Sequence, residues 1–162
     1  MTTFYAQPYS LDHTGFYFDN PEQFETKMQQ LEDRGCEEVE IQFIDGDDYQ
    51  AKLAKAADIG QGGITLWFEE LEFLDETAAT QLLFLLDDIG YSLSDALDRY
   101  EDVCLYEGKA SDYAYDLYQE CYEIPEHLRF YIDYEAIARD MKINGEITEL
   151  RYDLLVTNAN DF

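Results

Sequence analysis

Carboxylates are the groups of this sequence with the greatest chemical potential, because they far outnumber the other reactive side chains. The 162 residues include 37 Asp and Glu against 10 Lys and Arg, for a formal net charge of −27. Two carboxylates can act as general acid and base, several can hold a cation, and many together can stand in for nucleic-acid phosphates. Since so many acid pairs are available, no pair stands out, and we predict that the protein is not an enzyme.

Other residues with metal-binding or catalytic potential are sparse. His13 and His127 have no Cys or His at the spacing that metal ligands require. The segment Asp45-Gly46-Asp47-Asp48 is weakly similar to the start of a calcium loop, but its glycine is misplaced and Ala56 stands where the closing glutamate belongs. A hairpin turn is its ordinary interpretation. No nucleophile elbow, phosphate loop or dinucleotide fingerprint occurs, so we expect no metal site and no cofactor.

The excess of acidic over basic residues is greatest in the middle of the chain. Between Ala56 and Asp98 the sequence contains ten acids and neither Lys nor Arg. On helices these acids would project outward while Leu66, Phe68, Leu82 and Leu86 pack inward, which predicts a continuous negative surface. The residues assigned to this surface, including two acids that follow the segment, are Asp58, Glu69, Glu70, Glu72, Asp75, Glu76, Asp87, Asp88, Asp95, Asp98, Glu101 and Asp102.

The charge argues against two classes of partner and leaves two explanations open. Nucleic-acid-binding proteins place Lys and Arg against phosphates, and anionic lipids attract basic segments, so direct binding of DNA, RNA or membrane is not expected. One explanation is a generic acidic protein, for example from a salt-adapted organism. The other is mimicry of duplex DNA: its one charge per ~1.7 Å makes a charge of −27 equivalent to ~46 Å of duplex, and a compact globule of this length is ~40 Å across.

The elements that must position these acids are predicted to form an α+β fold with antiparallel pairing. Strands are expected at 3–7, 15–18, 39–44 and 103–107, with two more around 147–156. Helices are expected at 20–35, 48–58, 64–73 and 75–89, followed by a short helix capped by Ser94, one capped by Ser111, one opened by Pro125 and one near 133–142. The pattern of elements divides the chain into three segments, all of them acidic, which we predict to be small subdomains: a sheet and helix at 1–60, helices at 61–105 and a mixed segment at 106–162.

Composition also bears on the compartment and on the core. Hydrophobic residues make up 46% of the chain, which is ample for a folded core despite the charge. The three cysteines are widely separated, and neither a signal peptide nor an apolar run long enough to cross a bilayer is visible. We therefore expect a cytoplasmic protein. Tyr113, Tyr115, Tyr118 and Tyr122 fall within one predicted helix, where they either pack in the core or meet a partner.

Particular segments resemble the ArdA family of antirestriction proteins. The run 124–140, Ile-Pro-Glu-His-Leu-Arg-Phe-Tyr-Ile-Asp-Tyr-Glu-Ala-Ile-Ala-Arg-Asp, is similar to the antirestriction motif region of that family. The opening Phe4-Tyr5-Ala6-Gln7-Pro8-Tyr9, the stretch Thr14-Gly15-Phe16-Tyr17-Phe18 and the stretch 40–46 are similar to its N-terminal part. The resemblance spans nearly the whole chain and is weakest in the middle.

The resemblance implies a cytoplasmic inhibitor, usually encoded on mobile genetic elements, without catalytic residues. Such proteins mimic bent B-form DNA and occupy the DNA-binding groove of type I restriction-modification enzymes. Three subdomains in a row would pair into an elongated homodimer, with the 124–140 region near the contact. The residues expected at that contact are Leu128, Phe130, Tyr131, Ile132, Tyr134 and Ile137. The alternative function is an acidic decoy or adaptor for another basic nucleic-acid-binding protein.

Overall fold

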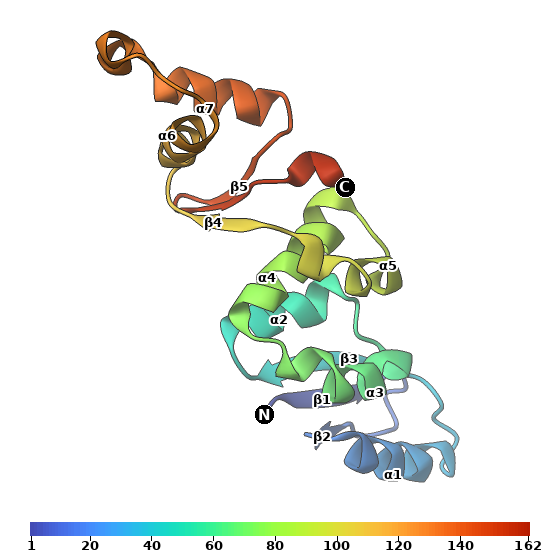
Figure 1. The fold of residues 1–162 in the computed structure, drawn as a ribbon. Coiled ribbons are helices and arrows are strands. Elements are labelled where there is room, and N and C mark those ends of the chain that lie inside the picture. Colours follow the sequence, from blue (N-terminus) through green and yellow to red (C-terminus); the bar gives the residue numbers. More distant parts are fainter. The chain divides into compact units, whose positions relative to one another are not determined.

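The computed structural model describes all residues from 1 to 162, which form two compact units, Met1–Leu97 and Asp98–Phe162. Each unit contains one three-stranded antiparallel sheet together with helices, which confirms the predicted α+β class (Figure 1). Residues on both sides of position 60 pack together within the first unit. The division into three subdomains stays a prediction.

The sheet of the first unit has β1 (Thr3–Pro8) at its centre, between β2 (Phe16–Phe18) and β3 (Val39–Asp45). All three strands were predicted, and both pairings are antiparallel. Helix α1 (Pro21–Glu32) begins as predicted, because the Asn20 side chain accepts a hydrogen bond of 2.8 Å from the backbone N–H of Gln23. Its buried residues, Phe24, Met28 and Leu31, follow helical spacing.

Aromatic side chains fill the core of the first unit. Phe4 of β1 lies opposite Phe18 and Phe43 in the sheet. Its ring meets Trp67 edge to face at 5.3 Å between centroids, and Phe68 at 5.8 Å. Trp67 is fully buried, and its indole N–H donates to the hydroxyl of Thr2 over 2.9 Å. This contact ties the start of the chain to a helix 65 residues away.

The remaining helices of the first unit are short and follow one another closely. They are α2 (Asp48–Ala56), a 3-10 turn at Gln61–Gly63, α3 (Ile64–Glu69), a 3-10 turn at Leu71–Phe73, α4 (Glu76–Leu83), a π-helix at Phe84–Ile89 and α5 (Leu93–Leu97). Three expectations are corrected here, the first being the helix 64–73, which ends at Glu69 and is followed by a separate 3-10 turn. The predicted single helix 75–89 changes to π geometry at Phe84, and Ser92 rather than Ser94 caps α5, since the Ser92 hydroxyl accepts from the Asp95 N–H.

The second unit packs two helices against a sheet of order β4-β6-β5. Its core joins Ala110, Ala114, Ala138, Met141, Ile147 and Leu155. Ser111 is not a cap but lies inside the first turn of α6, and the segment opened by Pro125 is a 3-10 helix. The elements are a 3-10 turn at Tyr100–Asp102, β4 (Leu105–Glu107), α6 (Ala110–Cys121), a 3-10 helix at Glu126–Tyr131, α7 (Tyr134–Ile143), β5 (Thr148–Arg151), β6 (Leu154–Val156) and a 3-10 turn at Ala159–Asp161.

Candidate functional site

Eleven of the twelve acids assigned to the negative surface are exposed in the structure. Nine of the twelve belong to the first unit, and Asp98, Glu101 and Asp102 belong to the second. Those of the first unit lie after α2, at the end of α3, in the 3-10 turn at Leu71–Phe73, at the start of α4, on the π-helix and on α5, and five of them flank helix ends. Helix ends face solvent, because their unpaired backbone groups need water or caps, so this arrangement presents carboxylates at many separate points.

Glu72 is the exception, because its side chain is only 12% exposed. Its Oε1 atom accepts hydrogen bonds from the backbone N–H of Thr2 over 2.6 Å and from the Thr2 hydroxyl over 3.0 Å. The amino group of Met1 lies 3.6 Å from the same atom. Glu72 therefore anchors the start of the chain beside Trp67, and we leave it out of the surface that we propose below.

Replacing Glu72 with Ala is expected to lower the free energy of unfolding by about 2 kcal/mol, since buried donors on Thr2 lose a charged acceptor. Urea unfolding followed through the fluorescence of Trp67, the single tryptophan, measures this loss. Exposed Glu70→Ala is the matched control, with an expected change within about 0.5 kcal/mol. Equal effects of the two substitutions would contradict the anchoring role.

Like charges lie close together at two places in the first unit. Burial raises the pKa of the Tyr49 hydroxyl, and the carboxylates of Asp47, Asp75 and Glu76 raise it further. The starts of α2 and α4 thus bring their acids to one phenol, and helix N-termini favour negative charge. On the π-helix, partial burial and the neighbouring Asp87 carboxylate raise the pKa of Asp88. Protonation would relieve this repulsion, as would contact with a cationic partner.

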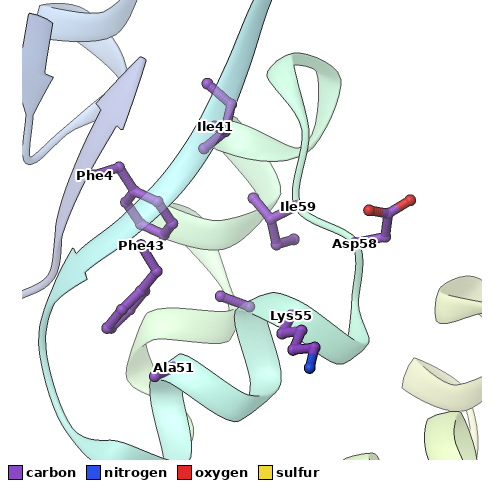
Figure 2. A pocket seen from close by; sticks show the side chains of 8 residues that line it. Phe4, Ile41, Phe43, Ala51, Lys55, Asp58 and Ile59 are labelled. Carbon is purple, nitrogen blue, oxygen red and sulfur yellow. The ribbon is translucent and has the colours of Figure 1, made fainter. Parts of the chain in front are cut away.

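The first unit also contains a cavity of about 250 Å³ between α2 and the sheet. Phe4, Ile41, Phe43 and Ile59 line it, while Lys55 and Asp58 lie at its edge (Figure 2). No nucleophile or acid–base pair converges inside it. Nowhere in the structure do three or more His, Cys, Asp or Glu side chains form a group that could hold a metal ion.

Comparison with known protein families identifies the family of this chain. A family model described as antirestriction protein (ArdA) matches residues 12–155, most of the chain. The chain belongs to the ArdA family. It is therefore an antirestriction protein, and membership of this inhibitor family implies that it binds restriction-modification enzymes. No curated protein matches the chain.

None of the helices of this ArdA chain is both long and apolar enough to cross a lipid bilayer.

The motif-like region 124–140 spans the 3-10 helix at Glu126–Tyr131 and most of α7. Phe130 and Tyr131 are 93% and 84% exposed, and Leu128 is also exposed. Ile132, Tyr134 and Ile137 are half-buried, and the last two pack against the core of the second unit. Only part of the predicted contact is thus accessible to a partner.

The tyrosines in and beside α6 are likewise partly buried and partly exposed. Tyr113 packs against the core and meets Tyr106 at 5.1 Å between ring centroids. Tyr115 and Tyr122 are exposed, and Tyr122 lies just beyond the end of α6 rather than within it. Tyr115 also lies edge to face with Tyr134 at 5.1 Å. The sequence alone did not decide whether these tyrosines pack in the core or meet a partner. In the structure, Tyr113 packs against the core, whereas Tyr115 and Tyr122 face solvent.

Two further exposed acids, Asp47 and Asp48, were not assigned to the negative surface from the sequence. Both are exposed where α2 begins; the helix was expected from residue 48, but the segment 45–48 was interpreted as a turn and its acids were not counted. A signal was present: the Gln50 side chain accepts from the backbone N–H of Asp47 over 3.0 Å, and an acid followed three residues later by Gln or Glu is typical of a helix start.

Proposed function

We propose that this ArdA chain inhibits type I restriction-modification enzymes by imitating the phosphates of bent B-form DNA with its exposed carboxylates. It would occupy the DNA-binding groove of the methyltransferase core, in the cytoplasm of a cell that carries a mobile genetic element. The observation that carries the proposal is the run of exposed acids between Asp58 and Asp98, where the sequence has no Lys or Arg to neutralise them. A groove that binds DNA presents Lys and Arg, and uncompensated carboxylates complement such a surface.

Displacement of DNA tests the proposal directly. A fluorescent duplex carrying the recognition site is bound to a type I enzyme, and the protein is added while anisotropy is recorded. We expect release of the duplex, with the midpoint rising as salt is added, because paired charges are screened. Inhibition of cleavage while the duplex stays bound would contradict groove occupancy. Release of DNA from unrelated basic proteins, but not from the type I enzyme, would favour the decoy function instead.

We propose further that the protein is a homodimer paired through the exposed part of the 124–140 region. Phe130 and Tyr131 present large apolar surfaces to solvent there, and exposed apolar patches are typical of protein contacts. Each protomer carries a charge of −27, so pairing is easiest where the surface is apolar.

Charge substitutions at this apolar patch test the dimer. Phe130→Asp and Tyr131→Asp should each convert the protein to monomers of 18.9 kDa in light scattering, because a buried unpaired carboxylate costs several kcal/mol. The matched control is Phe73→Asp, since Phe73 is equally apolar and 75% exposed in the other unit. If both patch variants stay dimeric, or if the Phe73 variant also becomes monomeric, the contact lies elsewhere.

A further inference from the structure

Basic side chains are rare in this protein, yet three of them line one cavity. Residues 106–162 contain five Lys and Arg, and a cavity of about 400 Å³ in the second unit is bordered by Lys109, Arg139 and Lys142. Two acids, Glu135 and Glu149, also line it, as do Ser111 and Tyr152. The cavity wall therefore carries a net positive charge, in a protein whose total charge is −27.

The fold explains why these side chains surround a hollow. Helices α6 and α7 pack together, and Ala110 and Ala138 form part of the cavity wall. Both alanines are buried, and such small side chains leave open space beside them. Arg139 and Lys142 lie one turn apart on α7, where residues three apart share a face. Lys109 comes immediately before α6, so the first turn of that helix borders the same space.

The three basic side chains differ in the contacts that they make within the chain. Lys142 forms an ion pair of 3.0 Å with Glu149, and the Lys109 ammonium lies 5.3 Å from the centre of the Tyr152 ring. Arg139 is exposed, and its guanidinium makes no hydrogen bond or ion pair within the chain. Its five N–H donors are therefore available in a fork that matches a carboxylate or phosphate.

We propose that this cavity binds the oxyanion of a small phosphorylated or carboxylated molecule, with Arg139 as the principal contact. Lys109 and Lys142 supply charge from the two sides of the cavity, and the N-terminal end of α6 favours an anion as well. The cavity volume of about 400 Å³ leaves room for more of the ligand than its oxyanion. Repulsion by distant acids is weakened beyond ~8 Å at physiological ionic strength, so the groups that touch the anion decide the binding.

Nuclear magnetic resonance of the whole protein tests the site with two probes, inorganic phosphate and succinate, each added at constant ionic strength. We expect the Arg139 side-chain Nε–H signal and the backbone signals of Ser111 and Tyr152 to shift along a saturable curve, with a dissociation constant on the order of 1 mM. Tighter binding of phosphate would identify a phosphate ester as the ligand class, and tighter binding of succinate would identify a carboxylate.

Substitutions distinguish binding at this cavity from a general effect of added ions on the protein. Arg139→Gln should weaken binding about tenfold or more, and Arg139→Lys should be intermediate because it keeps the charge but loses the fork. Arg34→Gln removes the same charge from the other unit and should leave the dissociation constant within about twofold of the wild type. Shifts that do not saturate, or equal binding by the Arg139→Gln and Arg34→Gln variants, would overturn the proposal. Circular dichroism checks that each variant is folded, and none of these measurements depends on inhibition of a restriction enzyme.

Discussion

Neutralising six exposed acids together is expected to weaken inhibition of a type I enzyme by about 100- to 10,000-fold, if each lost contact supplies about 0.5 to 1 kcal/mol. The acids are chosen because their side chains do not anchor or cap the fold, unlike Glu72, Asp75 and Asp95. The variant carries Asp58→Asn, Glu69→Gln, Glu70→Gln, Asp87→Asn, Asp88→Asn and Asp98→Asn. Titration against the enzyme and a cleavable plasmid measures the loss.

Salt dependence provides a second readout of the same variant. Binding of a polyanion to a basic groove weakens as salt rises, and the log–log slope becomes shallower by up to ~0.9 for each charge contact that is lost. We expect single changes at Asp87, Asp88, Asp95 or Asp98 to weaken inhibition only about two- to fivefold, because the attraction is distributed over many charges. If one such change abolishes inhibition while the protein stays folded, a specific site replaces the distributed surface.

A charge-matched control separates the effect of where the acids lie from the effect of the protein's total charge. Six other exposed acids, all within or beside the N-terminal sheet and α1, are neutralised instead: Asp12, Glu22, Glu25, Glu32, Glu37 and Glu38. This variant has the same net charge as the first but keeps the acids between Asp58 and Asp98. We expect it to lose less than about tenfold in inhibition. Equal losses in the two variants would mean that net charge, rather than the predicted surface, determines binding.

Replacing Trp67 with Ala is expected to lower the free energy of unfolding by about 4 kcal/mol. The side chain is fully buried, its ring lies edge to face with Phe4 and Phe43, and its N–H donates to Thr2. Total stabilities are typically about 5 to 15 kcal/mol, so a large part of the fold's stability depends on this one residue. Urea unfolding followed by circular dichroism measures the change.

Two companion substitutions make the Trp67 result interpretable. Trp67→Phe keeps much of the ring but loses the N–H donor, so a smaller loss of about 1 to 2 kcal/mol is expected. Phe73→Ala removes an aromatic ring that is exposed, with an expected change within about 0.5 kcal/mol. A Trp67→Ala loss no larger than that of Phe73→Ala would contradict the aromatic core as the main support of the first unit.

Local patterns predicted most of the elements of this fold, because each one depends on neighbours within a few residues. The cap at Asn20, the alternation of β3 and the helix near 133–142 are of this kind. The errors arose where two local signals compete. Two serines precede Asp95, and only the structure shows that the hydroxyl of Ser92 receives its N–H. Apolar spacing also continues through residue 89, so it does not reveal the change from α to π geometry.

The candidate sites were predictable to very different degrees. Acids without nearby bases are visible in the sequence, and eleven of the twelve acids are exposed. The anchoring role of Glu72 was not predictable, since its partner Thr2 is 70 residues away. The basic cavity was hidden for the same reason: Lys109 and Arg139 are 30 positions apart and meet only because α6 packs on α7. Charge pattern indicates which residues face solvent, while proximity between distant segments requires the fold.

The π-helix at Phe84–Ile89 has a consequence for how related proteins can diverge. Its hydrogen bonds span five residues instead of four, so it accommodates one more residue than the same stretch of α-helix. Loss of one residue here would restore regular α geometry and leave α4 intact. Because the wide turn absorbs the extra residue, such a deletion would leave the residues that follow it on nearly the same face of the helix. A relative can therefore lose one residue at this place in a single evolutionary step while Asp87 and Asp88 continue to face the same way.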